Sequence, residues 1–335
     1  MGERPRVLAI VGPTGTGKTE LACEIARRSG AEIIGVDSMQ VYRGMDIGTA
    51  KLSAELRAEI PHHGIDLVNP DEPMSAGRFA GYARRVAREI LARGRPVILC
   101  GGTGLYARAF AGGLVEGIEA DPGVRAELSK RGLVELYAEL RACDPASAQR
   151  IHPSDRVRIE RALEVQRVVQ RPLSLEHAEH GFRDRPFDVR WLGLDLAREQ
   201  LWKRLRERVG RMFEAGLVEE VRGLYTAGYG PELRSLQAIG YREVGCMLAG
   251  RMSQSEASEG VWVATRRYAK RQRTWFRAEP GLVWADASRP QLLVEQGLRE
   301  LEAVTLRRSS GTSYRSAPDR GQSPRSRARP SRPGI

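Results

Sequence analysis

An eight-residue stretch near the amino terminus carries the most specific chemistry in the sequence. Gly12, Pro13, Thr14, Gly15, Thr16, Gly17, Lys18 and Thr19 match the phosphate-binding pattern G-x-x-x-x-G-K-[ST] at every fixed position. An apolar run precedes this loop and a helical pattern follows it, so backbone N–H groups should converge on an anion at a helix N-terminus. Lys18 would add a positive charge, and the Thr19 hydroxyl could ligate Mg²⁺. The sequence therefore predicts a phosphate site but does not say what happens to the phosphate.

A nucleoside triphosphatase with such a loop also needs a strand-terminal Asp that helps to hold the metal. The best later strand runs instead into Cys100, Gly101 and Gly102, with no acidic residue where one is wanted. This disfavours motor and switch proteins.

Asp37 and Thr103 each follow another predicted strand, Asp37 19 residues after Lys18. Because the carboxyl ends of parallel strands face the ligand crevice, both side chains should share an edge with the phosphate loop. Asp37 would then act as a general base toward an acceptor molecule, or cap the turn that follows it. Thr103 would contact ligand, or form a plain strand-to-helix turn. Spacing alone leaves both pairs of alternatives open.

A basic helix is predicted near the carboxyl end of the chain. Ser253 and Glu256 have capping-box spacing, and the helix they open contains VWVATRRYAKRQRTWFR. Four cations on it, Arg266, Lys270, Arg273 and Arg277, fall on one face. Because acidic residues are nearly absent from 266 to 277, anion binding is favoured over a solvated charged face.

The elements that must position these residues alternate between strand and helix. Strands are predicted at residues 7–11, 32–36, 65–68, 97–100, 190–195 and 282–285. This alternation predicts an α/β fold with a parallel sheet of the P-loop NTPase type. Residues 118–186 show helix signals and no strand signal, so they should form an inserted all-helical domain. The catalytic core should comprise residues 1–117 and 187–302, the latter with a helical carboxyl-terminal part.

Composition narrows the class of protein. The chain has 335 residues, is 41 % apolar, and contains four scattered cysteines without a C-x-x-C pair. No run approaches the ~18 apolar residues of a membrane span, and a reduced cytoplasmic location fits. The net charge of +12 includes +7 from the eight Arg and one Asp after residue 306, which leaves 12 − 7 = +5 for the rest. Residues 303–335 are predicted to be a disordered basic tail, either a loose nucleic-acid tether or a tail with no role.

Six motifs together resemble one enzyme family. GPTGTGKT, DSMQVYRGMDIGTAK, HHGIDLVNP, GGTGLY, SLQAIGYRE and AKRQRTWFR occur in the order and spacing of the tRNA dimethylallyltransferases. The resemblance implies transfer of the dimethylallyl group from dimethylallyl diphosphate to N6 of the adenosine 3′-adjacent to the anticodon, with release of diphosphate. It implies Mg²⁺ as cofactor and the tRNA anticodon stem-loop as partner. Nothing in the sequence demands a partner subunit, so a monomer is expected.

The resemblance also implies roles for individual residues. Lys18, Thr16, Thr19 and Mg²⁺ would offset the charge on the leaving diphosphate, with Thr19 as metal ligand, and Asp37 would take the proton from N6. Thr103 would complete the catalytic group. The residues that the resemblance implies for tRNA contact are Asp37, Ser38, Met39, Gln40, Thr103, Arg125, Val157, Arg158, Ile159, Glu160, Arg161, Gln237, Ala238, Ile239, Gly240, Tyr241, Arg242, Lys270, Arg271, Gln272, Arg273, Thr274, Trp275, Phe276 and Arg277.

Two other functions are compatible with parts of the pattern. A small-molecule or nucleoside kinase would bind ATP in the loop and use Asp37 to activate a hydroxyl, which leaves the basic helix and the helical insertion without a use. A non-catalytic RNA-binding protein would carry the loop as a vestige.

Overall fold

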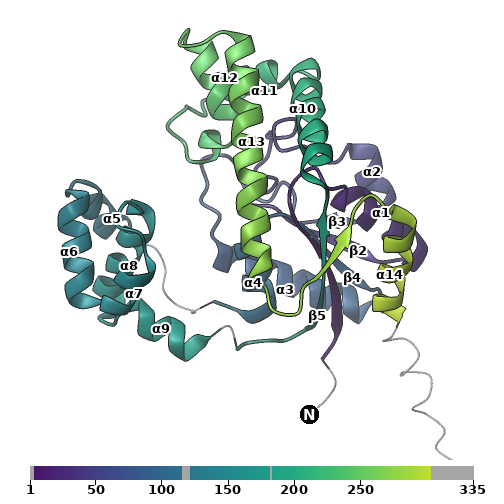
Figure 1. Ribbon diagram of the computed structural model, residues 1–335, viewed down its shortest axis with the longest axis horizontal. Helices are drawn as coiled ribbons and strands as arrows, with labels where there is room; N and C mark the ends of the chain where they lie inside the picture. The colour runs from purple at the N-terminus through teal and green to yellow at the C-terminus, as the bar shows by residue number, and fades with distance from the viewer. Residues whose placement is uncertain (1–3, 115–120, 182, 303–335) are drawn as a thin grey trace, which may run out of the picture.

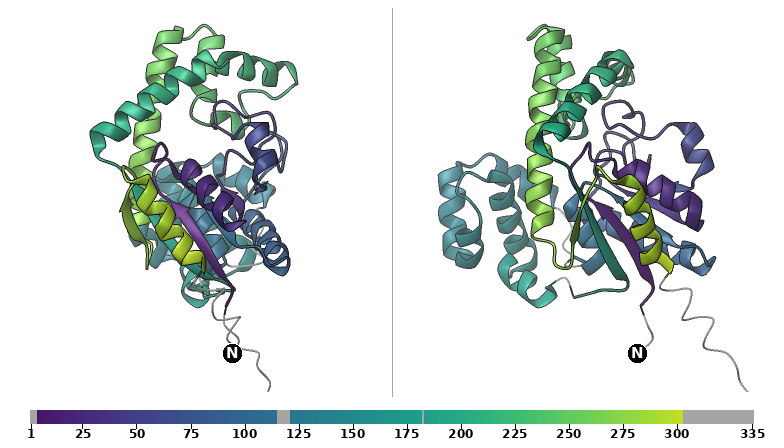
Figure 2. Two further views of the ribbon diagram at one scale, coloured as in Figure 1. Left: turned by 90° about the vertical axis from the view of Figure 1, so that its right-hand side faces the viewer. Right: turned by 45° about the vertical axis from the view of Figure 1, so that its right-hand side comes forward.

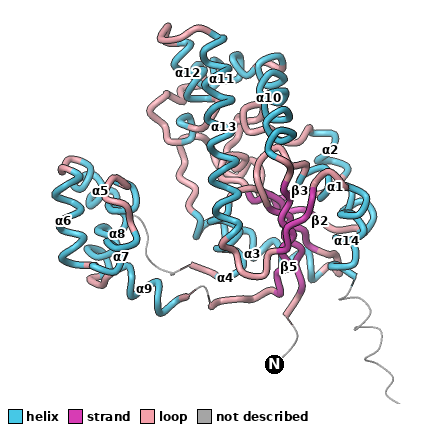
Figure 3. Tube along the Cα trace, viewed as in Figure 1, coloured by secondary structure: helices cyan, strands magenta, loops and turns pink. Residues whose placement is uncertain are grey.

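A six-stranded sheet forms the centre of the computed structural model, which describes residues 4–114, 121–181 and 183–302. The strands lie in the order β3-β2-β4-β1-β5-β6, and every neighbouring pair is parallel. Figure 3 shows them gathered in one part of the molecule, with helices around and beyond them. Their bounds are β1 Arg6–Val11, β2 Glu32–Val36, β3 His62–His63, β4 Val97–Gly101, β5 Asp188–Asp195 and β6 Val283–Asp286. The predicted parallel α/β fold is confirmed; the predicted tail lies outside the described residues.

Strand β1 is buried on both faces because helices cover each side of the sheet. One set of its side chains, which includes Val7 and Val11, packs with Phe79 of α3 (Ala76–Ala92) and Phe110 of α4 (Gly104–Gly112). The alternate set, which includes Ile10, packs with helices α1 (Lys18–Ser29) and α14 (Pro290–Glu302), which lie side by side in Figure 2. Burial on both faces explains why the strand reads as a continuous apolar run.

The third strand is not where the apolar pattern predicts it. Residues 65–68 were expected to be extended, but β3 is the preceding pair, His62–His63, and Val68 makes only an isolated bridge with Tyr42. Gly64 and Asp66 both have positive φ, 84° and 55°, which interrupts an extended chain. A Cβ at Gly64 would lie 2.6 Å from the Gly35 carbonyl oxygen, so this turn packs tightly on β2. The other strands begin and end within two residues of their predicted bounds.

In the described residues, the helices between α4 and β5 form a lobe to one side of the sheet (Figure 1). They are α5 Pro122–Ser129, α6 Leu133–Cys143, α7 Pro145–Arg150, α8 Arg156–Val169 and α9 Leu173–His180. Leu128, Leu136, Leu140 and Leu163 are fully buried in the lobe's own apolar core. Its first helix begins as predicted, with Pro122 in the first turn and the Asp121 carboxylate accepting from the Val124 N–H at 3.0 Å. The predicted bounds of the insertion, residues 118 and 186, stay a prediction.

The remaining helices extend the molecule above the carboxyl edge of the sheet. They are α2 Ala54–Glu59, α10 Arg198–Glu214, α11 Leu217–Thr226, α12 Tyr241–Leu248 and α13 Gln254–Arg277, with a 3-10 turn at Ser235–Gln237. The predicted capping box opens α13, with the Ser253 N–H donating to Glu256 at 2.7 Å. No described helix has the length and apolar character needed to cross a membrane.

Helices α10 and α13 are joined by alternating guanidinium and indole groups. Arg266 of α13 lies 3.9 Å from the ring centroid of Trp202 of α10 and 4.4 Å from that of Trp262. Arg198 and Arg206 cover the two indoles at 3.9 and 3.7 Å. Cation–π contacts of this kind contribute ~0.5–2 kcal/mol each. Arg266 therefore fastens α10 to α13, and does not stand on an open basic face as predicted.

Glu164 is a buried charge of the helical lobe, with a side chain only 1 % exposed. Its carboxylate accepts from the Asp121 N–H at 2.9 Å, from Arg125 at 2.7 Å and from Arg161 at 2.6 Å. Burial alone would raise the pKa of Glu164, but these hydrogen bonds outweigh it, so the pKa lies below its usual value of 4.5.

We expect Glu164→Gln to lower the free energy of unfolding of the lobe by about 1–3 kcal/mol, because charge-assisted hydrogen bonds become neutral ones. Since the folded-state pKa is lowered, this contribution is present above pH 4.5 and is lost as the pH falls through the folded value. Hydrogen exchange of α5 and α8 amides against pH measures both effects. Glu127→Gln, an exposed partner of Arg167 in the same lobe, should change protection by less than about 0.5 kcal/mol. Equal losses in the two variants would contradict the assignment.

Candidate active site at the carboxyl edge of the sheet

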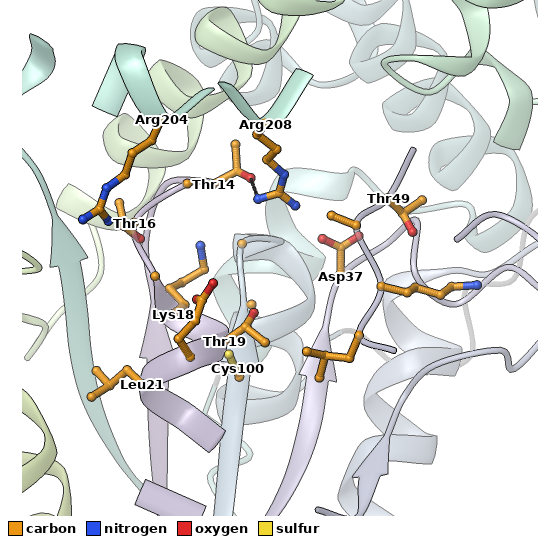
Figure 4. A pocket seen from close by; sticks show the side chains of 18 of the residues that line it. Thr14, Thr16, Lys18, Thr19, Leu21, Asp37, Thr49, Cys100, Arg204 and Arg208 are labelled. Carbon is orange, nitrogen blue, oxygen red and sulfur yellow. Dashed lines mark hydrogen bonds between the residues drawn. The ribbon is translucent and has the colours of Figure 1, made fainter. Parts of the chain in front are cut away.

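A cavity of about 1180 Å³ opens where the parallel strands end. The phosphate loop, Asp37 and Cys100 line it from the sheet side, and α10 and α13 line it from the other. Figure 4 shows the ends of Lys18, Arg208 and Asp37 turned toward the same space. The predicted sharing of one edge by the loop and Asp37 is therefore confirmed in geometry.

The phosphate loop adopts a conformation that depends on its glycines. Gly15 and Gly17 have φ of 85° and 84°, a region that other residues rarely occupy. A Cβ on Gly15 would lie 2.7 Å from a methyl of Leu205, so α10 packs directly over the loop. Helix α1 begins at Lys18, which directs its free N–H groups and the positive end of its dipole at the cavity.

Lys18 is held inside this loop. Its ammonium group donates to the Pro13 carbonyl at 2.7 Å, and the Thr16 hydroxyl donates to the same oxygen at 2.9 Å. The pKa of Lys18 is lowered to about 8, chiefly by burial and to a smaller extent by the charge of Arg208, while Cys100, Asp37 and Glu20 act in the opposite direction. An anion in the cavity would restore the charged form, because opposite charge favours the ammonium ion.

Three arginines of α10 complete the cationic wall, and sequence reasoning missed them. Arg204, Arg208 and Arg211 line the cavity, and Arg208 donates to the Thr14 hydroxyl at 3.3 Å. Burial lowers the pKa of Arg208. Among the described residues no carboxylate pairs with Arg208 within 4 Å. The spacing i, i+4, i+7 on a predicted helix was a signal that could have found this wall.

Asp37 performs the turn-capping role that the sequence left open. One carboxylate oxygen, Oδ1, accepts from the Met39 N–H at 2.8 Å and from the Gln40 N–H at 3.3 Å. No hydrogen bond to the other oxygen occurs within the described parts of the chain. Because the side chain also lines the cavity, capping and a role toward an acceptor are compatible.

Thr103 ties two loops together at the same edge. Its hydroxyl accepts from the Ser38 N–H at 3.0 Å, and the residue is the N-cap of α4. Tyr268 of α13 lies in the cavity wall, and burial raises the pKa of Tyr268 to about 12. Tyr268 lies just outside the stretch implied by the resemblance, and no local pattern marks it.

Gln272 is the buried contact between α13 and the phosphate loop. Its side-chain oxygen accepts from the Thr14 N–H at 2.8 Å, and its side-chain nitrogen donates to the Gly102 carbonyl at 2.9 Å. The residue is 5 % exposed. Gln272 thus joins the loops after β1 and β4, and it is a structural element of the cavity wall.

The position at the end of β4, where an ATPase would carry an acid, holds Cys100. Its thiol lies in the cavity wall, and burial raises its pKa to about 12, so it stays protonated. Across residues 4–114, 121–181 and 183–302, no group of three or more His, Cys, Asp or Glu side chains could hold a metal ion. A metal here would need oxygen atoms from a bound phosphate.

The residues of the predicted basic segment of α13 lie in different surroundings. Arg273 pairs with Asp195 at the end of β5, at 3.0 Å from Nε, so the expected lack of acidic partners is wrong. The partner comes from a strand far away in the sequence. Phe276 is buried in the main core, and Trp275 stacks under Arg108, 4.8 Å from its guanidinium carbon. Among residues 270–277, the exposed side chains are Lys270, Arg271, Thr274 and Arg277.

The residues implied for tRNA contact in the helical lobe also differ in exposure: some are buried or paired, and others are exposed. Ile159 is fully buried in the lobe core, so its side chain has no exposed surface, and its contact with tRNA stays a prediction. Arg125 and Arg161 are engaged by Glu164, and Glu160 pairs with Arg156 at 2.7 Å. Val157 and Arg158 stand exposed on the lobe surface.

Residues 237–242 connect the 3-10 turn to α12. Gln237 and Arg242 are exposed there, whereas Gly240 and Tyr241 are buried, and Ala238 and Ile239 are half-buried. Tyr241 donates its hydroxyl to Glu220 at 2.6 Å. This segment is therefore partly surface and partly an internal joint.

Comparison with known proteins gives a consistent result. Residues 40–279 match the family model described as IPP transferase, and residues 5–59 match one described as isopentenyl transferase. The tRNA dimethylallyltransferase of Geobacter sulfurreducens is 50 % identical over 85 % of this chain and 93 % of its own. The tRNA dimethylallyltransferase of Anaeromyxobacter dehalogenans is 47 % identical over 83 % of this chain and 94 % of its own.

Two solved structures extend the likeness to three dimensions. The full-length tRNA isopentenylpyrophosphate transferase of Bacillus halodurans is 36 % identical, with a TM-score of 0.67 over 91 % of this chain and all of that one. A eukaryotic dimethylallyltransferase acting on tRNA is 27 % identical, with a TM-score of 0.77 over 93 % of this chain and 81 % of its own.

We expect Gln272→Leu to destabilise the protein by about 2–4 kcal/mol, because the Thr14 N–H and the Gly102 carbonyl lose their partners inside the protein. Its affinity for inorganic diphosphate, measured by isothermal titration calorimetry, should fall about tenfold as the loop loosens, which corresponds to ~1.4 kcal/mol. Gln272→Glu keeps an acceptor for the Thr14 N–H, so its affinity for diphosphate should lie between those of the wild type and Gln272→Leu. Gln254→Leu, on the exposed first turn of α13, is the control. Wild-type diphosphate affinity in Gln272→Leu would refute the bridging role.

Proposed function

The chain belongs to the tRNA dimethylallyltransferase family and prenylates the adenosine at position 37 of tRNA, and from this we propose how its residues carry out the transfer. The observation that supports the proposal is the cavity itself. The cationic side chains of the phosphate loop and α10 line the same cavity as a carboxylate, Asp37. A phosphate-bearing donor and a nucleophilic acceptor would meet there.

The donor is dimethylallyl diphosphate, with its diphosphate on the loop. The N–H groups at the start of α1, Lys18 and Arg208 surround the position where negative charge develops. Because Arg208 has no carboxylate partner among the described residues, its charge is available to the leaving group. Preorganised donors of this kind can each contribute ~3–4 kcal/mol to the stability of a transition state.

The transfer is a substitution at the first carbon of the dimethylallyl group. The lone pair of the adenosine N6 forms a bond to that carbon, and the bond from the carbon to the diphosphate oxygen breaks. Diphosphate leaves with the bonding electron pair. Asp37 takes the proton that N6 loses, while its Oδ1 continues to cap the turn. The adenosine must leave its stack to reach this buried space.

Mg²⁺ fits the cavity as an ion carried by the donor. Thr19 offers a hydroxyl in the cavity wall, and Mg²⁺ commonly binds through few protein ligands together with substrate phosphate oxygens and water. When bound, the ion would supply positive charge to the departing diphosphate. Thr19 is the ligand that we propose, and no other protein ligand is required.

The tRNA would approach along α13 and the helical lobe. Lys270, Arg271 and Arg277 are exposed on α13, and Val157 and Arg158 are exposed on the lobe. Figure 1 shows the lobe on one side of α13 and the sheet on the other. We propose that these surfaces hold the anticodon stem-loop while Ser38, Gln40 and Thr103 border the entry of the base. Phosphate contacts of this kind weaken with added salt.

We expect Asp37→Asn to lose about 10²–10⁴ in the single-turnover rate of prenyl transfer, because the amide keeps the turn cap but cannot take a proton. Mass spectrometry of nucleosides from tRNA incubated with enzyme and dimethylallyl diphosphate measures the product. Binding of tRNA should stay within about twofold of wild type. Asp37→Ala removes the cap as well, so comparing the two separates base and cap. A wild-type rate in Asp37→Asn would eliminate the base role.

We expect donor affinity to fall as the pH rises above about 8, the pKa of Lys18. Only the ammonium form attracts the diphosphate, and its fraction falls about tenfold for each pH unit above the pKa. Calorimetry in buffers of different ionisation enthalpy should therefore show proton uptake on binding at pH 9. Lys18→Met should bind more weakly and without this pH dependence. A flat profile in the wild type, or the same profile in both proteins, would contradict the role of Lys18.

A further inference from the structure

The segment between β2 and α2 forms one wall of the cavity. Gln40, Asp46, Ile47 and Thr49 all line the space beside Asp37. The Gln40 side-chain nitrogen donates to the Thr49 carbonyl at 3.0 Å, so the wall is closed on itself. Its conformation determines where Gln40 and Thr49 stand relative to Asp37.

Glu220, on the first turn of α11, grips this wall from outside the cavity. Its carboxylate accepts from three successive backbone N–H groups, those of Asp46 at 2.9 Å, Ile47 at 2.7 Å and Gly48 at 3.2 Å. The Tyr241 hydroxyl donates to the same carboxylate at 2.6 Å. Hydrogen bonds to an ionised acceptor are roughly twice as strong as neutral ones. Four donors on one carboxylate therefore fix residues 46–48 to α11 and α12.

Tyr241 packs closely against residues 46–48. A Cβ on Gly48 would lie 2.7 Å from Cζ of the Tyr241 ring, so no larger residue fits at position 48 without movement. Tyr241 is fully buried, and burial together with the charge of Glu220 raises its pKa well above the usual value, so it remains a donor. Tyr241 belongs to residues 237–242, which the resemblance implies for tRNA contact and which we call the tRNA-recognition segment.

A second anchor keeps the wall attached if Glu220 is lost. The Lys51 ammonium, on a side chain 1 % exposed, donates to the Tyr42 carbonyl at 2.6 Å and to the carboxylates of Asp46 and Asp66 at 2.7 and 2.6 Å. Arg57 also pairs with Asp66 at 2.8 Å. Removing the Glu220 contacts should therefore release residues 46–48 locally without unfolding the loop.

We propose that Glu220 is a positioning residue that couples the tRNA-recognition segment to the donor cavity. The linkage runs from residues 237–242 through the Tyr241 hydroxyl to Glu220, and from Glu220 to the amides of residues 46–48. These amides set the wall that carries Gln40 and Thr49 beside Asp37. Neither Glu220 nor Tyr241 lines the cavity. The inference rests on the proposed function of the cavity and adds the residue that holds its acceptor side in place.

Glu220→Gln tests the proposal, with Glu219→Gln as matched control, because both glutamates lie in the first turn of α11 and Glu219 is exposed. We expect the single-turnover rate of prenyl transfer to fall about 10- to 100-fold in Glu220→Gln, the scale of a small misplacement of reacting groups. Donor affinity should stay within about twofold in both variants, because the phosphate loop is untouched. The control should keep the wild-type rate. A wild-type rate in Glu220→Gln would overturn the proposal, as would an equal loss in Glu219→Gln.

Two further measurements separate this inference from the proposed function. Hydrogen exchange at Ile47 and Gly48 should speed up in Glu220→Gln whatever reaction the cavity performs, and unchanged protection would overturn the clamp by itself. Absence of prenyl transfer in the wild type would instead refute the proposed function. In a double-mutant cycle, Tyr241→Phe should cost less in the Glu220→Gln background than in the wild type. Strict additivity of the two losses in rate would overturn the coupling.

Discussion

The buried amide of Gln272 is the contact on which the geometry of the site depends. A parallel sheet delivers its loops to one edge, but each loop could settle independently there. Gln272 holds an N–H from the loop after β1 and a carbonyl from the loop after β4, and it comes from a helix outside the sheet. One planar group with a donor and an acceptor thereby sets three segments against one another. Burial makes the arrangement specific, because a shift would leave polar groups without partners.

Around this contact the cavity accumulates cations that the protein does not neutralise internally. Lys18 is buried and Arg208 is half-buried, and burial lowers the pKa of both. Elsewhere, buried Arg84 pairs with Asp184, and half-buried Arg273 pairs with Asp195. Within the described residues, Lys18 and Arg208 lack the carboxylate partners that these other arginines have, which identifies the cavity as a site for an anionic ligand. Asp37 stands across from these cations, and its capped oxygen fixes the direction of the other.

The outer helices serve this site at a distance. Arg266 lies between two tryptophans and fastens α10 to α13, so the arginines on the cavity side of α10 are carried on a fixed support. Glu220 does the same for the wall that follows β2. Both devices use a charged group to immobilise a neighbour, and neither touches the space where the reaction takes place. A site that must select one base of a large RNA requires such rigid walls.

The sequence by itself determined the parts whose causes are local. The phosphate loop, the run of parallel strands, the capped starts of α5 and α13 and the helical character of the insertion all follow from short patterns, because spacing along the chain fixes them. The third strand was misplaced, since the turn at Gly64 depends on the backbone of β2.

Tertiary structure alone decided which charged side chains face the cavity and which are paired with other groups of the protein. Thr14 and Gln272 are separated by 258 residues, and Ile47 and Glu220 by 173. Arg208 and Tyr268 line the cavity, Glu220 holds its wall, Arg266 and Arg273 have partners inside the protein, and Ile159 is buried, all because distant segments meet. The physical reason is that a side chain's protonation, partners and exposure depend on its neighbours in space, and no local pattern records who those neighbours are.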